Sequence, residues 1–305
     1  MNIPLPLRRF SMRGVFWRQY LDWAVENVPT FVEPIVMAAY TTFFFLFWGP
    51  GRRAVARNLG AIFPESSAVV NLGRAWRVFW NFAWTFTDTA RFNLQRLSMD
   101  WEFEGLEHFR DLVSNPSGSV LLTAHMGNYD LGSYLFAERT ERTISIVRAP
   151  ETDPESEAFS SRKRAKAVSE GFRIHYSTDS RMVALDLLEA IRGGEIVAIQ
   201  GDRAIPGVSS FETEMFGLRV KLPSGPFALA MATRTRIYPL FITRAGRRRY
   251  RLVALEPIEC RRAGRDRDRD LREATSIWTT ALERTIRRHW SQWFTFEHFG
   301  VDEER

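Results

Sequence analysis

The chain has 305 residues, of which 45% are hydrophobic and 26% are charged, and its formal net charge at pH 7 is +6. This length suits one large α/β domain or two smaller ones with a sizeable buried core. The single cysteine, Cys260, excludes an intramolecular disulfide and a cysteine-based metal cluster. The positive charge favours an anionic partner but does not distinguish nucleic acid, lipid headgroups and phosphorylated carriers.

The first hundred residues predict a helical, aromatic-rich region (1–100) that associates with a membrane surface. Apolar side chains recur at helical spacing between Val78 and Ala90. The longest apolar run, residues 35–48, is shorter than the ~20 residues of a spanning helix. Basic residues flank this run on both sides, at Arg8, Arg9, Arg13, Arg18, Arg52, Arg53 and Arg57. A spanning helix has them mainly on one side, so we expect the run to lie in one leaflet. A spanning helix and an ordinary buried helix are the alternatives.

From residue 101 onward, short apolar segments alternate with helical ones, which predicts an α/β domain over 101–305. Alternation of this kind indicates a mostly parallel sheet flanked by helices. The expected strands are 119–124, 144–149, 172–177 and 195–200, and the expected helices are 129–138, 154–171 and the segment between Ser180 and Gly193. A polar loop to Leu222, a helix from Pro223, a hairpin of 237–243 with 250–258, a solvated charged loop at 261–270 and a helix at 271–290 complete the pattern.

The segment 121–132, LLTAHMGNYDLG, has the pattern of a catalytic site. A buried strand ends at His125, and Asp130 follows in the first turn of a helix. Between them Gly127 and Asn128 allow a tight turn and are expected to contact the substrate. Ligands of open α/β sheets bind beyond the carboxyl ends of the strands. We expect the turn to bring the Asp130 carboxylate to Nδ1 of His125, which leaves Nε2 free to take a proton from an attacking hydroxyl.

This segment contains no serine nucleophile, so the acceptor is expected to attack the acyl carbonyl directly, without an acyl-enzyme. The structural alternative is a histidine that caps a buried turn.

Two arginines and an aspartate follow other strands at the same expected edge. Arg148 ends the second strand, and Asp202 and Arg203 follow the fourth. The guanidinium fork suits phosphate, so both arginines are expected to bind the acceptor headgroup or the donor phosphate. Asp202 is expected to order Arg203 or to hold a second acceptor group. Ordinary surface arginines are the alternative.

A further anion site is expected where Lys221, Pro223, Ser224 and Gly225 open a helix, because backbone N–H groups at such a terminus face an anion. A plain helix cap is the alternative. No zinc spacing, P-loop, dinucleotide fingerprint or G-x-S-x-G occurs, so neither a metal nor a cofactor is expected. The signs in RRAGRDRDRD nearly cancel, which argues against a nucleic-acid partner.

Five motifs in order resemble the lysophospholipid acyltransferase superfamily, in the branch related to the late acyltransferases of lipid A biosynthesis. They are RRAVARNLGAIFP (52–64), H-x4-D at 125–130, Arg148, Gly201-Asp202-Arg203 and FGLRVKLPSGPFALA (216–230). The resemblance covers about residues 50–260. It implies a histidine base with an acidic partner, an acyl carrier protein or acyl-CoA donor, a lipid or glycolipid acceptor, and work at the cytoplasmic face of the inner membrane.

The chain departs from this pattern at two places. The lipid A branch typically has Glu where Asp130 stands, and the glycerolipid branch has E-G-x-R in place of Gly201-Asp202-Arg203. These differences leave the acceptor open. The sequence therefore predicts an acyltransferase that moves a fatty acyl chain to a hydroxyl or amine. A thioesterase or ester hydrolase on the same scaffold and a catalytically inactive lipid-binding protein are the alternatives.

Overall fold

The computed structural model describes residues 15–95, 97–149, 153–159, 161, 171–176, 180–205, 207–262 and 266–301. Most of the helix expected at 154–171 lies outside these ranges, as do Arg8, Arg9 and Arg13 of the basic flank. Residues 154–159 are helical, in agreement with the start of that helix.

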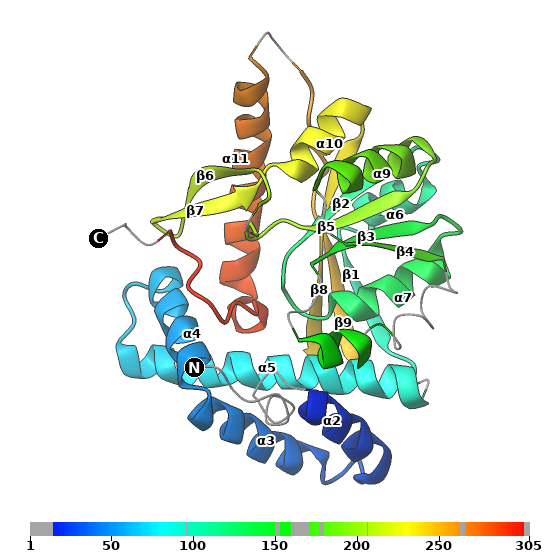
Figure 1. Ribbon diagram of the computed structural model, residues 1–305. Coiled ribbons are helices and arrows are strands. Elements are labelled where there is room, and N and C mark those ends of the chain that lie inside the picture. Colours follow the sequence, from blue (N-terminus) through cyan, green and yellow to red (C-terminus); the bar gives the residue numbers. More distant parts are fainter. Residues whose placement is uncertain are drawn as a thin grey trace.

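The N-terminal part is helical throughout residues 15–95, apart from short turns, as predicted. It consists of α2 (Val15–Asn27), α3 (Glu33–Phe47), α4 (Gly49–Ile62) and the long α5 (Ala68–Gln95). Figure 1 shows α5 running beneath the sheet, with α2 and α3 on its far side. Among the described helices none is by itself long and apolar enough to cross a membrane. The pair α3–α4 passes that test jointly by length and composition, and it is bent by 91°.

The centre of the molecule is a mostly parallel sheet, which confirms the predicted fold class. Its strands lie in the order β1-β9-β8-β2-β5-β3-β4, and the short β10 (Ile258–Glu259) pairs with β8. Their bounds are β1 Asp100–Glu104, β2 Ser119–Thr123, β3 Ile144–Arg148, β4 Phe172–Tyr176, β5 Ile196–Gln200, β8 Arg236–Gly246 and β9 Arg249–Ala254. β8 and β9 form the predicted antiparallel hairpin, and β2, β5, β3 and β4 are parallel neighbours.

Helices cover both faces of this sheet, and for this reason every residue of the central strand β2 is buried. Successive residues of β2 point to opposite faces: Leu121 packs with Leu131 of α7 (Tyr129–Arg139), and Leu122 belongs to the core that includes Trp278. The remaining described helices are α6 (Leu106–Ser114), α9 (Ser180–Arg192), α10 (Gly225–Thr233), α11 (Arg267–Arg288) and the 3-10 turn η1 (Trp290–Gln292).

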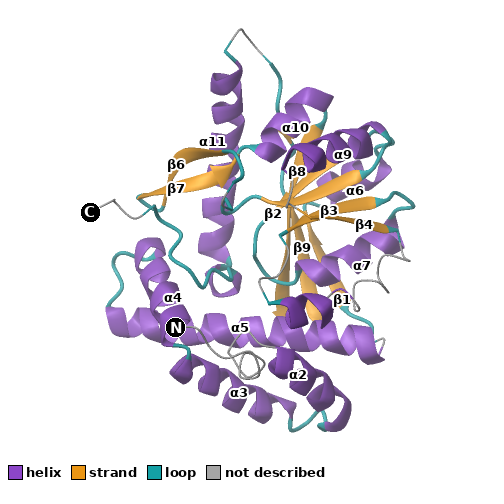
Figure 2. Cartoon of the chain, in the orientation of Figure 1, coloured by secondary structure: helices purple, strands orange, loops and turns teal. Residues whose placement is uncertain are grey.

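The sequence prediction has three kinds of local error. The expected polar loop before Leu222 contains a hairpin of β6 (Ser210–Met215) and β7 (Leu218–Pro223), which lies apart from the main sheet beside α11 (Figure 2). Its turn residues Phe216 and Gly217 both have positive φ, as a two-residue hairpin turn requires, but Phe-Gly is not the usual Asn-Gly signal.

The other two errors concern helix starts and an edge strand. Pro223 ends β7, and α10 begins at Gly225. The charged run is in part the first turn of α11, because Asp266 caps it by accepting from the N–H groups of Asp268 and Arg269. The edge strand β1, with its polar sequence DWEFE, was not predicted at all.

A buried polar network joins α5 to the sheet. The Asp88 carboxylate accepts from the Tyr250 hydroxyl at 2.6 Å and from Nε of Arg244 at 3.2 Å. Burial raises the pKa of Asp88, and the charges and hydrogen bonds of Arg244 and Tyr250 offset only part of that effect. A second buried pair, Arg91 with Glu33 at 2.7 Å, ties α5 to α3. These contacts fix the helical part against the strands.

The C-terminal segment returns across α4. Asn58, in the motif at residues 52–64, donates from Nδ2 to the carbonyl oxygens of Thr295 and Glu297 at 3.2 and 2.8 Å. Its Oδ1 lies 3.2 Å from Nδ1 of His298. A buried asparagine thus satisfies backbone groups of a segment that has no regular secondary structure.

We expect Asn58→Ala to lower the free energy of unfolding by about 1–3 kcal/mol, because buried groups lose their hydrogen-bond partners. Activity should fall as well, since the released segment supports the site described below. Denaturant unfolding followed by circular dichroism measures the first effect. Asn27→Ala, which removes an exposed hydrogen bond in α2, is the control. Equal stability of the two variants would contradict the anchoring role.

Candidate active site

His125 and Asp202 form a hydrogen-bonded pair at the carboxyl edge of the sheet. Strands β2 and β5 are parallel neighbours, with Thr123 opposite Gln200. His125 and Asp202 each stand two residues beyond this register pair, so the topology brings them together. Nδ1 of His125 lies 2.7 Å from Oδ1 of Asp202, and the backbone N–H of His125 donates to the same oxygen at 3.2 Å.

The environment of Asp202 keeps its carboxylate ionised. Burial by itself would raise its pKa, but the charges of His125 and Arg203 and hydrogen bonds from His125 and Trp293 hold the pKa well below its usual range. Nε1 of Trp293 donates to Oδ2 at 2.9 Å. An ionised carboxylate only accepts hydrogen bonds, so Nδ1 of His125 carries the hydrogen and Nε2 of the neutral ring is left as a proton acceptor.

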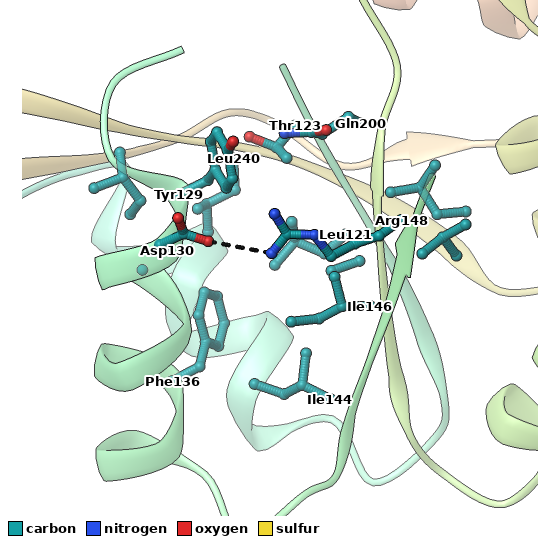
Figure 3. Close-up of a pocket in the computed structure, with 15 residues that line it drawn as sticks. Leu121, Thr123, Tyr129, Asp130, Phe136, Ile144, Ile146, Arg148, Gln200 and Leu240 are labelled. Atoms are coloured by element: carbon teal, nitrogen blue, oxygen red, sulfur yellow. Dashed lines mark ion pairs between the residues drawn. The ribbon is translucent and has the colours of Figure 1, made fainter. Parts of the chain in front are cut away.

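This geometry corrects the expected partner of His125. Asp130 lies in the first turn of α7, where its Oδ1 forms an ion pair with Nη1 of Arg148 at 3.6 Å (Figure 3). Its side chain is 46% exposed, whereas that of Asp202 is fully buried. The interaction at Nδ1 that the sequence assigned to Asp130 is made by Asp202.

Gly127 and Asn128 shape the turn between β2 and α7. Gly127 has a φ of +59°, and an added Cβ would lie 1.7 Å from the carbonyl oxygen of Ile242, so only glycine fits. Asn128 caps α7 by accepting from the N–H of Leu131, and its Nδ2 donates to the Thr85 carbonyl and the Tyr250 hydroxyl. Both residues thereby hold His125 in place; their contact with a substrate stays a prediction.

Of the other predicted binding residues, Arg203 lies nearest the pair. Its Nη2 donates to the carbonyl of Phe294 and the hydroxyl of Thr295, and lies 3.4 Å from Oδ2 of Asp202. The prediction that Asp202 orders Arg203 agrees with this contact. Lys221 lies on the exposed side of β7, 3.6 Å from a carboxylate oxygen of Glu212, and Pro223 and Gly225 line a cleft beside Arg203.

Two hollows adjoin at the carboxyl edge of the sheet, and one of them reaches His125. The α7 cavity lies between α7 and the strands β2, β5 and β3, has a largely apolar lining (Figure 3) and a volume of about 100 Å³. The α9–α10 cleft lies between those two helices, reaches His125 and Arg203, and has a volume of about 530 Å³, within the ~300–1,000 Å³ typical of ligand sites. Tyr129, Val147, Arg148, Ile199 and Gln200 border both.

The sequence did not single out Trp293, Tyr129 or Gln200. Trp293 reaches the site because the C-terminal segment folds back: the N–H of Phe294 donates to the carbonyl of His125 at 2.8 Å. In the sequence, Trp293 is marked only by the aromatic residues around it, far along the chain from the H-x4-D motif. Tyr129 was visible inside H-x4-D but has no role that spacing alone predicts. Within the part of the chain that the structure describes, no group of three or more His, Cys, Asp or Glu could hold a metal ion.

The arrangement suits a group-transfer reaction on substrates that have apolar parts. A histidine held in one tautomer by a buried carboxylate can remove a proton from a nucleophile, and the two hollows can take the apolar parts of the substrates. Together the fold and the site are those of an α/β enzyme with a histidine base candidate at the carboxyl edge of its sheet.

Comparison with known proteins gives the family. The sequence profile of the bacterial lipid A biosynthesis acyltransferases matches residues 8–298, and the chain belongs to that family. Curated relatives are the phosphatidylinositol mannoside acyltransferases of two Mycobacterium tuberculosis strains, CDC 1551 / Oshkosh and ATCC 25618 / H37Rv. Each is 23% identical over 233 residues, which cover 73% of this chain and 71% of the relative. The protein is therefore an acyltransferase of lipid biosynthesis, acting on lipid or glycolipid acceptors.

We expect Asp202→Asn to lower kcat by about 10²–10⁴-fold, because the histidine loses the charge that stabilises its protonated form. Asp130→Asn should have a smaller effect, which acts through the position of Arg148. Steady-state kinetics of the two variants, with circular dichroism to verify folding, compares the two carboxylates. A mild Asp202→Asn and a severe Asp130→Asn would show that the observed hydrogen bond is not the functional one.

Proposed function

We propose that the protein transfers a fatty acyl chain from acyl carrier protein or acyl-CoA to a hydroxyl or amine of a lipid or glycolipid, with His125 as general base. The observation that carries this proposal is the His125–Asp202 pair, with His125 lining the largely apolar α9–α10 cleft. This cleft, of about 530 Å³, suits an acyl chain, whereas the adjoining α7 cavity, of about 100 Å³, suits only a small part of a substrate.

The reaction follows from these positions. The acceptor oxygen or nitrogen attacks the thioester carbonyl carbon with its lone pair. As it does so, Nε2 of His125 takes the proton from the acceptor O–H or N–H. The C=O π electrons move to oxygen and form a tetrahedral intermediate. When this intermediate collapses, the C–S bond breaks, and the thiolate takes the proton from the imidazolium. Asp202 stabilises the imidazolium in between, and His125 ends neutral.

The arginines support binding of phosphorylated substrates. Arg148 and Arg203 both border the α9–α10 cleft beside His125, and Pro223 and Gly225 line the same wall. Both proposed donors have phosphate on their pantetheine arm, and a guanidinium binds phosphate through two hydrogen bonds. We assign this cleft to the transferred chain, through its aliphatic lining, and to the phosphorylated part of the donor or acceptor, through the two arginines.

The acceptor in this proposal is a hydroxyl-rich lipid headgroup. The curated relatives are named for phosphatidylinositol mannoside, and the matching family is named for lipid A, both of them glycolipids. A sugar hydroxyl is a nucleophile that one general base can activate. Incubation with acyl donor and no acceptor separates transfer from hydrolysis, because a hydrolase would release free fatty acid.

We also propose that the helical part of residues 1–100 binds the cytoplasmic face of the inner membrane. The exposed apolar side chains of this part include Trp23, Phe31, Ile35, Leu46 and Phe47. Clustered exposed aromatic and aliphatic side chains suit the membrane interface. Arg53 and Arg57, both exposed on α4, add attraction to anionic headgroups.

We expect His125→Ala to abolish transfer, with a loss of about 10²–10⁴-fold in kcat, while the fold is kept. The assay follows a radiolabelled acyl group from acyl-CoA, or from acyl carrier protein, into the lipid fraction. His108→Ala, at a half-buried histidine on α6, is the matched control. More than about a third of wild-type turnover in His125→Ala would refute the general-base assignment.

Binding to vesicles tests the membrane surface. We expect Phe31→Ser/Ile35→Ser/Phe47→Ser to lower partition into anionic phospholipid vesicles by about tenfold or more, since three exposed apolar side chains lose their insertion energy. High salt should release the wild type only in part, because it screens the arginines and not the apolar contact. Ile277→Ser, on the exposed side of α11, is the control for Ile35→Ser. Unchanged sedimentation of the triple variant with vesicles would contradict the proposed surface.

A further inference from the structure

The α7 cavity has one polar end and one apolar end. Thr123, Gln200 and Arg148 are the last residues of the parallel strands β2, β5 and β3, and all three border the cavity. Earlier residues of the same strands and of β8 form the apolar part of the lining, namely Leu121, Ile144, Ile146, Ala198 and Leu240. Figure 3 shows Phe136 and Ile144 at one end of the cavity and Thr123 and Gln200 at the other.

Tyr129, Arg148 and Gln200 border both this cavity and the larger α9–α10 cleft, where His125 lies. A thioester whose carbonyl lies beside His125 in the cleft is therefore bordered by these polar side chains. The rings of Tyr129 and His125 have centroids 6.4 Å apart at an angle of 80°. The base and the tyrosine thus line the same cleft, one beside the other.

We propose that Tyr129 is a further catalytic residue, whose hydroxyl donates a hydrogen bond to the oxyanion that forms from the thioester carbonyl. This inference rests on the proposed acyl transfer. In that step the carbonyl oxygen gains the π electron pair and becomes negatively charged, and it returns the pair when the C–S bond breaks. A donor aimed at this oxygen is worth more in the intermediate than in the ground state, which is how it raises kcat.

The surroundings of Tyr129 suit that role. Burial, together with the charge of Asp130, raises the pKa of Tyr129 to about 12, so the hydroxyl keeps its proton at neutral pH. The charges of Arg148 and Arg203 and a hydrogen bond with Gln200 act in the opposite direction, which shows that positive charge also reaches this hydroxyl. Positive charge at the same place favours a developing oxyanion.

The backbone holds Tyr129 in a fixed position. It is the first residue of α7, directly after the cap Asn128, whose side chain is hydrogen-bonded to the N–H of Leu131, the Thr85 carbonyl and Tyr250. A donor held by a buried network loses little energy to reorganisation when charge develops. The position of Tyr129 is thus set by the same turn that sets His125.

Tyr129→Phe is the direct test, because it removes only the hydroxyl and keeps the ring that separates the hollows. We expect kcat to fall about 10²–10³-fold with KM for the acyl donor changed less than about threefold. Tyr238→Phe, which removes a hydroxyl bound to Asp111 on α6, is the matched control and should keep wild-type kcat. The assay uses palmitoyl-CoA, or palmitoyl-loaded acyl carrier protein, with a total polar lipid extract as acceptor.

Binding of a thioether analogue separates catalysis from structure. S-hexadecyl-CoA has a methylene in place of the carbonyl, so a hydroxyl that acts only on the oxyanion should not affect its Kd. Equal Kd values for wild type and Tyr129→Phe, with the loss confined to kcat, support the inference. A Kd that rises by as much as kcat/KM falls would reduce Tyr129 to a binding or packing residue.

The outcomes also distinguish this inference from the proposed function. If the wild type transfers no acyl group, or if His125→Ala transfers as well as the wild type, the proposed acyl transfer fails. If the wild type transfers, His125→Ala does not, and Tyr129→Phe retains kcat within about threefold, only the role of Tyr129 is overturned.

Discussion

The structure depends on one buried carboxylate. Asp202 is removed from water, which is costly for an ionised group unless it is paired and hydrogen-bonded. Its oxygens are satisfied by His125, by the indole of Trp293 and by Arg203, which come from the end of β2, the C-terminal segment and the end of β5. The site therefore exists only when these three parts of the chain are assembled. The same carboxylate fixes the histidine tautomer that proton transfer needs.

The turn between β2 and α7 connects this pair to the rest of the molecule. Gly127 allows the chain to pass against β8, and Asn128 links α7 to α5 and to Tyr250 of β9. Tyr250 in turn donates to Asp88 of α5. The helices that present apolar side chains to solvent are thus joined by buried hydrogen bonds to the turn that holds His125. Such a connection fixes the position of His125 relative to these helices.

The distribution of polar and apolar side chains around the hollows follows from the parallel sheet. In parallel strands all the carboxyl ends lie at one edge, so the polar side chains that follow them collect there, while earlier residues of the same strands stay apolar. Arg148 and Ile146 illustrate this within one strand, β3. This edge therefore combines polar side chains with an apolar lining. The Asp130–Arg148 ion pair joins α7 to β3 at this edge.

The sequence by itself determined most local elements and the position of His125 at the end of a buried strand. Apolar runs such as 119–124 are short, continuous and followed by turn residues, and their burial in parallel strands follows from that pattern. His125, Gly127 and Asn128 lie within four positions, so their turn was predictable from local chemistry. The tertiary structure decided which carboxylate meets His125, because that depends on the adjacency of β2 and β5 and on a C-terminal segment far away in the chain. Asp130 was close in sequence, yet the helix cap at Asn128 places it opposite Arg148. Trp293 and the Phe216–Gly217 hairpin turn were likewise set by long-range packing, which no local pattern encodes.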